Sequence, residues 1–305
     1  MRVCRVSDDV STGGVRCCRL SGWHRSTGCA RARCYPSDLT DAGWVILDPL
    51  LPDPMALRGY GGRREEHCRR TIVDAWLYVI DNGIKWRALP KDFPPWRTVK
   101  NIIDRWERAG VSQKILDELR GRERLRQHRA ASATAGSIDS QSVKADATVG
   151  AKTRGFDGGK KINGRKRHLV VDVLGLLIAV VVSPANVHDI HGAKLAIRQA
   201  KAAEPRLRHL WADSAYQGTL LTWALGTLAL VIQIVKRGTE KGFKILPRRW
   251  VIERSNAWTL GARRLVRDYE RLPATSEAII RWRHAIIMLR RQAANPTKPD
   301  TTNTQ

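Results

Sequence analysis

The spacing of hydrophobic residues changes once along this 305-residue chain, and the change limits the folds open to it. Up to about residue 128, apolar side chains recur at the spacing of amphipathic helices. From residue 137 onward, short runs rich in β-branched residues alternate with helical segments. The sequence therefore predicts a small all-helical region followed by a region that contains a sheet.

Four helices are predicted in the first region. Thr40 can cap the first helix, which ends before Pro52, and Asn82-Gly83 suits the end of the second. The third, Trp96 to Arg108, has one apolar and one basic face, and a charge-rich fourth covers Ser112 to Gln127. This arrangement suits a helix-turn-helix-like DNA-binding domain. The alternative is an ordinary small bundle, whose helices also have charged outer faces.

The second region begins with a predicted strand over Ser137 to Ala145. Two β-rich runs, Arg167 to Val173 and Leu176 to Ser183, flank a tight turn at Leu174-Gly175. Helices and strands then alternate, with helices over Asp189 to Ala203, Gly218 to Leu228 and Ser276 to Gln292, and strands over Arg208 to Asp213 and Leu230 to Lys236. This order predicts an α/β fold with a mixed sheet and flanking helices, as in ribonuclease H.

These patterns divide the chain into five segments. We expect a disordered leader over residues 1–34, a helical DNA-binding domain over 35–128, a linker over 129–136, a ribonuclease H-like catalytic domain over 137–293 and a flexible tail over 294–305. Five of the six cysteines fall in the first 34 residues, so a zinc site in the leader is the alternative to disorder there.

The charge of the chain indicates its partner. There are 54 Lys and Arg against 29 Asp and Glu, a formal net charge of +25, which indicates that the chain binds a polyanion. Eleven Trp argue against a disordered basic tail. No apolar run approaches the roughly 18 residues of a membrane span, so we expect no membrane partner and a cytoplasmic location.

Three acidic residues lie at the edges of apolar elements rather than on charged faces: Asp139, Asp213 and Glu253. If the first and fourth predicted strands are parallel neighbours, the two aspartates can lie together, and a later helix can add the glutamate. Carboxylates this close repel unless cations neutralise them. The sequence thus predicts a site for two Mg²⁺ or Mn²⁺ ions that acts on a phosphodiester. Singly, each acid could instead cap a turn or pair at the surface.

Basic residues gather in the sequence around these acids and on the third helix. Contacts to DNA phosphates are predicted for two groups near the acids: Lys160, Lys161, Arg165, Lys166 and Arg167 on a Gly-interrupted loop, and Lys236, Arg237, Arg248, Arg249 and Arg254 around the glutamate. Recognition of a specific DNA sequence is predicted for Arg97, Lys100 and Asn101. Solvated surface positions are the alternative for any one of them.

An ordered series of motifs resembles the DDE transposases of bacterial insertion sequences, specifically the insertion-sequence-five-like family. It comprises Tyr35-Pro36-Ser37-Asp38-Leu39-Thr40, Lys85-Trp86-Arg87-Ala88-Leu89-Pro90, Ile138-Asp139-Ser140-Gln141-Ser142, Trp211-Ala212-Asp213 and Arg249-Trp250-Val251-Ile252-Glu253-Arg254. The catalytic acids that the resemblance implies are Asp139, Asp213 and Glu253. Related groups have a tyrosine and a lysine where this chain has Leu246 and Leu260.

The resemblance implies metal-dependent cutting and joining of DNA at the ends of an insertion sequence. Its implied partners are the terminal inverted repeats and target DNA, bound by a homodimer at the nucleoid. Two other functions stay open. An inactive or repurposed copy would bind DNA without cutting it, and a ribonuclease H-like nuclease would hydrolyse nucleic acid without joining strands.

Overall fold

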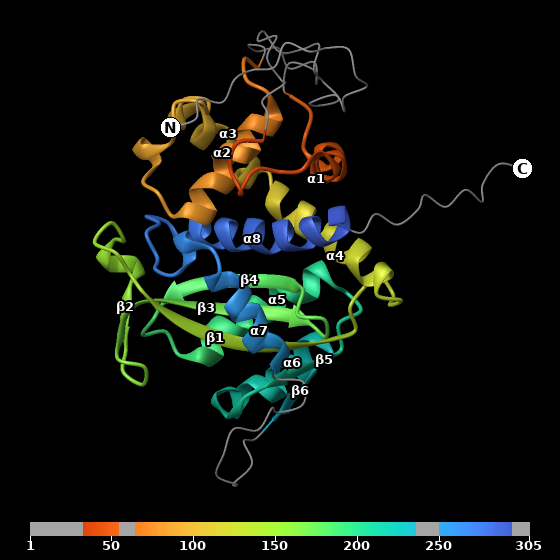
Figure 1. Cartoon of the computed structure of the whole chain (residues 1–305). Coiled ribbons are helices and arrows are strands. Elements are labelled where there is room, and N and C mark those ends of the chain that lie inside the picture. The colour runs from red at the N-terminus through yellow and green to blue at the C-terminus, as the bar shows by residue number, and fades with distance from the viewer. Residues whose placement is uncertain (1–32, 55–64, 236–249, 295–305) are drawn as a thin grey trace, which may run out of the picture. The chain divides into compact units, whose positions relative to one another are not determined.

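The structure, a computed structural model, describes residues 33–54, 65–235 and 250–294 (Figure 1). The chain divides into two compact units. Met1–Ile115 with Ile286–Gln305 form the first, here called the helical unit, and Leu116–Ala285 form the second, the sheet unit. Two long helices, α4 (Val111–Arg126) and α8 (Pro273–Ala294), each contribute residues to both units.

The helical unit contains α1 (Asp41–Leu47), the 3₁₀ turn η2 (Asp48–Leu50), α2 (Arg69–Asn82), the turn η4 (Trp86–Ala88) and α3 (Trp96–Arg108). The side chain of Thr40 accepts a hydrogen bond from the Gly43 amide at 3.1 Å, so the predicted cap of α1 is confirmed. The predicted end of α2 is also confirmed, because Gly83 follows it in the left-handed conformation with φ 67°. The buried side chains of this unit include Trp44, Trp76, Val99, Ile103 and Trp106.

The sheet unit is built on a six-stranded mixed sheet. Its strands are β1 (Ala135–Lys144), β2 (Gly155–Asp157), β3 (Ile162–Asp172), β4 (Leu177–Pro184), β5 (His209–Ala212) and β6 (Val231–Ile234). β3 lies between β1 and β4 and pairs antiparallel with both, and β2 also pairs with β3. β1, β5 and β6 are parallel neighbours. The central order β4-β3-β1-β5-β6 and the covering helices confirm the predicted ribonuclease H-like fold.

One face of the sheet packs on α5 (Asp189–Ala203) and α6 (Thr219–Leu228). This apolar core contains Ile138, Val170, Ala196, Leu210 and Leu220, all almost fully buried. Burial on this scale is the main favourable contribution to folding, at roughly 25 cal/mol per Å² of apolar surface. The regular alternation of inward and outward side chains along β1 and β3 directs their other residues to the opposite face.

The opposite face is covered by α7 (Trp250–Leu260), which packs on β1 and β3 (Figure 1). Side chains of β3 also bond to the 3₁₀ turn η7 (Arg263–Leu265) and to Ser276 in the first part of α8. Two arginines of β3, Arg165 and Arg167, point into this layer and are fully buried. The Arg165 guanidinium donates to Asp268 at 3.1 Å and to the backbone carbonyl of Glu270 at 2.8 Å. A buried cation is tolerated only when such partners satisfy it.

The turn between β3 and β4 is held from within by Asp172, which is fully buried at the end of β3. One carboxylate oxygen of Asp172 accepts from the amides of Leu174 and Leu176, each at 2.9 Å, and Arg124 of α4 pairs with the other oxygen. Burial raises the pKa of the Asp172 carboxyl, while these hydrogen bonds and Arg124 act in the opposite direction. The turn conformation is therefore tied to the start of the sheet unit.

The predicted elements agree with the observed ones, with small shifts at their ends. The predicted helix Asp189 to Ala203 has the same bounds as α5. The predicted hairpin corresponds to β3 and β4, although β3 starts earlier, at Ile162. The sequence missed β2 because three residues within a glycine-rich loop give no strand pattern. In the described segments, no helix combines the length and apolar character that a membrane crossing requires.

The predicted five-segment division stays a prediction. The compact units are not consecutive along the chain, since residues 286–305 group with the first 115 residues and residues 116–126 group with the sheet. The leader 1–34, except its last two residues, and the tail from residue 295 lie outside the described residues.

Replacing Arg165 with leucine should lower the free energy of unfolding by about 3–5 kcal/mol, because the buried Asp268 carboxylate would lose its ion-pair partner. Urea unfolding of the full chain measures this change. The matched control is Arg122→Leu, which removes an exposed pair with Glu118 and should cost about 0.5 kcal/mol or less. Equal losses for the two variants would contradict a structural role for Arg165.

Candidate active site

The parallel pairing of β1 and β5 brings two of the predicted acids together. Ser137 of β1 lies opposite Trp211 of β5. Continuing this register by two residues puts Asp139 beside Asp213, which directly follows β5. Both aspartates are half-buried. This register places two residues far apart in the sequence on neighbouring strands in the middle of the sheet, at the carboxyl end of β5.

The chain turns sharply after Asp213, and the aspartate itself stabilises the turn. Its carboxylate accepts a hydrogen bond from the Ala215 amide at 3.0 Å and so caps the 3₁₀ turn η6 (Ser214–Tyr216). This is the ordinary structural role of an aspartate at such a position. It also fixes the orientation of the carboxylate relative to the end of β5.

Tyr216 lies at the end of this turn, and its phenol is affected by the charges of both aspartates. Its ring is buried, and burial raises the pKa of its phenol well above the usual value. The carboxylates of Asp139, Asp189 and Asp213 raise this pKa further. Tyr216 therefore keeps a neutral hydroxyl, and both candidate acids are close enough to act on it.

The third acid is carried by α7, which packs against β1 and β3. Two side chains anchor this helix to the β3–β4 turn. Arg254 donates to the carbonyl of Leu174, and Ser255 donates to the carbonyl of Gly175, both at 2.8 Å. Gly175 has φ +79°, and a Cβ there would lie 2.9 Å from the Ser255 hydroxyl. The rotation of α7 about its axis is thus fixed.

With the helix in this orientation, Asn256 reaches Asp139. Its side-chain amide donates to the Asp139 carboxylate at 3.2 Å. Glu253 precedes Asn256 by three positions, and residues three apart lie on the same side of a helix. Glu253, which is exposed, is therefore one helical turn from the residue bonded to Asp139.

Carboxylate oxygens are the ligands that Mg²⁺ and Mn²⁺ prefer, so the donors of these three residues fit such ions. Within residues 33–54, 65–235 and 250–294, however, no three His, Cys, Asp or Glu side chains converge closely enough to hold an ion. The meeting of Asp139, Asp213 and Glu253 at one metal centre therefore stays a prediction.

Two of the predicted phosphate ligands are exposed at the turn between β2 and β3. Lys160 donates from its ammonium group, at 3.1 Å, to the carbonyl of Ser140, the residue that follows Asp139 in the chain. Lys161 follows it with φ 54°. A third, Arg254, is half-buried between the rings of Trp250 and Trp258, with centroid distances of 4.4 and 4.7 Å. Its guanidinium is used in anchoring α7.

The prediction of DNA contact was wrong for three residues of β3. Arg165 and Arg167 have no exposed surface, and Lys166 is 6% exposed. Arg167 donates to the carbonyl of Leu265 at 2.8 Å, and Lys166 pairs with Asp189 at 3.1 Å. These side chains are buried inside the fold, so they are not available to phosphates.

The remaining predicted DNA ligands fall into two groups. Arg97 and Asn101 are exposed on α3, and Lys100 pairs there with Asp104. The other four, Lys236, Arg237, Arg248 and Arg249, lie outside the described residues.

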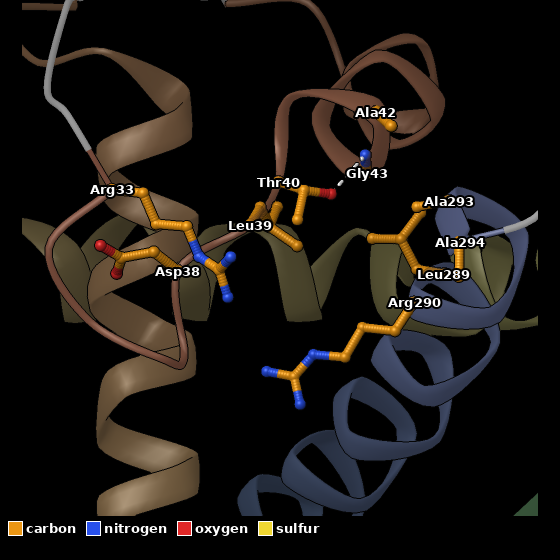
Figure 2. A pocket seen from close by; sticks show the side chains of 10 residues that line it. All are labelled: Arg33, Asp38, Leu39, Thr40, Ala42, Gly43, Leu289, Arg290, Ala293 and Ala294. Atoms are coloured by element: carbon orange, nitrogen blue, oxygen red, sulfur yellow. Dashed lines mark hydrogen bonds between the residues drawn. The ribbon is translucent and has the colours of Figure 1, made fainter.

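A pocket of about 280 Å³ occurs in the helical unit (Figure 2). It lies between the start of α1 and the last turns of α8, and both Arg33 and Arg290 line it. The Arg290 guanidinium also pairs with Asp81 at 3.2 Å. None of the predicted catalytic or DNA-binding residues lines this pocket, so it does not mark the acidic site.

A buried histidine lies on the opposite face of the sheet from α7. His168 bonds to the Ser183 hydroxyl through Nε2, at 3.0 Å, and Gly192 of α5 leaves it room, because a Cβ there would lie 2.0 Å from Nε2. Burial lowers the pKa of His168 from 6.5 to about 4, so the ring is neutral at pH 7. It is a packing residue beneath the acidic site.

Comparison with known families agrees with this geometry. Residues 131–288, more than half of the chain, match the family described as "Transposase DDE domain". The chain belongs to this transposase family. Residues 39–116 match a second family, described as "Putative transposase of IS4/5 family". The resemblance seen in the sequence motifs is confirmed, and it assigns the chain to DNA transposition.

Two relatives from Burkholderia cepacia match shorter segments. The chain is 28% identical over 117 residues to "Insertion element IS402 uncharacterized 16.2 kDa protein", covering 35% of this chain and 73% of that protein. It is 34% identical over 115 residues to "Putative transposase for insertion sequence element IS402", covering 35% of this chain and 54% of that protein.

Sequence reasoning missed Asn256, which bonds to Asp139, and Tyr216, whose phenol is affected by the charges of Asp139 and Asp213. A signal was available for each. Tyr216 follows Asp213 by three residues in a tight turn, and Asn256 follows Glu253 by three residues on a helix. Spacing of this kind brings side chains to the same side, but neither residue has a charge that singles it out.

Replacing Gly175 with alanine should detach α7 from the sheet, because the added Cβ would meet the Ser255 hydroxyl and the backbone would be strained. We expect a loss of more than about 1–3 kcal/mol in the free energy of unfolding, the range for backbone strain alone. The matched control is Gly110→Ala, where φ is also positive, at +69°, but nothing lies within 4 Å. Equal losses would contradict the docking contact.

His168 should make the folded state sensitive to acid. The unfolded chain binds a proton at this imidazole near pH 6.5, whereas the folded protein binds it only near pH 4. Stability from this residue is therefore present above pH 6.5 and lost as the pH falls towards 4. Between pH 7.5 and 5.0, His168→Gln should lose about 2 kcal/mol less than the wild type in urea unfolding. An unchanged pH dependence would contradict this assignment.

Proposed function

We propose that this chain is an active transposase that cuts DNA at the ends of an insertion sequence and joins the freed 3′ ends to target DNA. The observation that supports the proposal is the parallel register of β1 and β5, which, continued by two residues, puts Asp139 beside Asp213. Glu253, one turn from the residue bonded to Asp139, is proposed as the third catalytic acid.

The three acids are proposed to hold two Mg²⁺ or Mn²⁺ ions. When bound, such a pair supplies a Lewis acid for the attacking and leaving oxygens of a phosphodiester. The chain's own residues have distinct tasks around it. The cap at Ala215 orients the Asp213 carboxylate, and the docking of α7 on the β3–β4 turn sets the position of Glu253. Tyr216 keeps a neutral hydroxyl beside the acids.

Binding of DNA is proposed to involve two surfaces. Lys160 and Lys161, exposed near Asp139, would contact phosphates close to the bond that is cut. Arg97, Lys100 and Asn101 of α3 would read the terminal inverted repeats. The four basic residues outside the described part, Lys236, Arg237, Arg248 and Arg249, are proposed as further phosphate ligands.

We further propose that a homodimer brings two ends of the element together, in the cytoplasm at the nucleoid. Attack on target DNA needs both ends in one complex, so two copies of the chain on DNA are the simplest assembly. Sizing of the complex formed with end-containing DNA measures this directly.

Asp139→Asn should abolish cleavage of DNA that carries the element's ends in the presence of Mg²⁺, because an amide has one neutral ligand oxygen where the carboxylate has two charged ones. Asp213→Asn should do the same. The matched control is Asp146→Asn, which changes an aspartate just beyond β1 whose carboxylate accepts from Thr148. Its cleavage rate should equal that of the wild type.

The products of this assay separate the proposed function from its two alternatives. Wild-type protein that binds the ends without cutting them would indicate a repurposed DNA-binding protein. Hydrolysis without transfer of any 3′ end would indicate a nuclease of the same fold. Joined products that require Asp139 and Asp213 would support transposition.

A further inference from the structure

The side chain of Asn256 has one polar atom in use and one without a partner. Its Nδ2 donates to the Asp139 carboxylate at 3.2 Å. Its Oδ1 is buried and has no hydrogen-bond partner among residues 33–54, 65–235 and 250–294. Leaving a buried acceptor unpaired costs free energy, so such an atom in a folded protein calls for a donor or a cation.

The orientation of this amide follows from its neighbour. Turning the amide over would bring its oxygen to the position now held by Nδ2, 3.2 Å from a carboxylate oxygen, where two acceptors would repel. Asn256 therefore keeps its N–H toward Asp139 and its carbonyl oxygen on the other side. The side chain cannot satisfy Oδ1 by rotating.

The helix cannot move to satisfy it either. Arg254 and Ser255 fix α7 on the β3–β4 turn immediately before Asn256, and Ser255 is fully buried. The amide group that carries the unpaired oxygen is thus held at Asp139 by its nitrogen, one helical turn from Glu253. An amide oxygen is a hard, neutral ligand of the kind that binds divalent cations alongside carboxylates.

We infer that Asn256 belongs to the divalent-cation site of this transposase, orienting Asp139 through Nδ2 and adding Oδ1 as a further oxygen acceptor. The inference rests on the proposed function, since it assumes that Asp139 binds a metal ion. It explains why an uncharged residue occupies the helix position facing the strand acid. A purely structural amide would hold Asp139 but would add nothing to metal binding.

Mn²⁺ binding to the full chain, measured by calorimetry without DNA, tests this role. Asn256→Ala should raise the Mn²⁺ dissociation constant about 10- to 100-fold, the range seen when a residue that supports a metal ligand is removed. Asn256→Asp should restore binding, because it returns an oxygen ligand. The matched control, Asn163→Ala, changes an exposed asparagine of β3 and should bind Mn²⁺ as the wild type does.

Thermal unfolding separates this role from a structural one. Without Mn²⁺, Asn256→Asp should unfold at a lower temperature than the wild type, because two carboxylates then face each other. Adding Mn²⁺ should raise its unfolding temperature by more than it raises that of the wild type. If Asn256 had only a structural role, Mn²⁺ would not raise the unfolding temperature of Asn256→Asp by more than it raises that of the wild type.

Two results would overturn the inference: Mn²⁺ binding by Asn256→Ala within twofold of the wild type, or no recovery of binding in Asn256→Asp. Asp139→Asn distinguishes this failure from that of the proposed function. If Asp139→Asn loses Mn²⁺ binding while Asn256→Ala retains it, only the role of Asn256 is wrong. If both retain it, the metal site at Asp139 is wrong as well.

Discussion

The turn between β3 and β4 is the point on which the geometry of the acidic site depends. Asp172 holds it from inside the sheet, through the amides of Leu174 and Leu176. α7 binds its outer side through the two carbonyls at Leu174 and Gly175. Because these carbonyls accept from consecutive helix residues, they set both the position and the rotation of α7. Asn256 on this helix then reaches Asp139 of β1, whose parallel partner β5 ends immediately before Asp213.

The chemistry of β3 explains why so basic a chain still forms a packed sheet. Three consecutive cations, Arg165, Lys166 and Arg167, enter opposite layers and find partners in each. Arg165 meets Asp268 on the side of α7, and Lys166 meets Asp189 on the side of α5. These contacts join segments distant in sequence. Part of the positive charge therefore contributes to folding rather than to the binding of nucleic acid.

Much of the fold was predictable because its signals are local. Hydrophobic period, the cap at Thr40 and the turn at Leu174-Gly175 each depend on a few neighbouring residues, and they located the helices and strands correctly. The neighbourhood of Asp139 and Asp213 followed from one topological expectation, that two strands are parallel. Partners distant in sequence were not predictable. Arg165 looked like a surface residue because Asp268, which neutralises it, gives no local sign of their contact. Asn256 carries no charge, and only the docking of α7 reveals its bond to Asp139.

The attachment of α7 also affects where the chain length can differ between members of this family. Among the described residues, bonds from Arg254 and Ser255 to a distant hairpin hold the helix that carries Glu253. These bonds involve no residue of the connection between β6 and α7, so a relative can differ in length there and still form them.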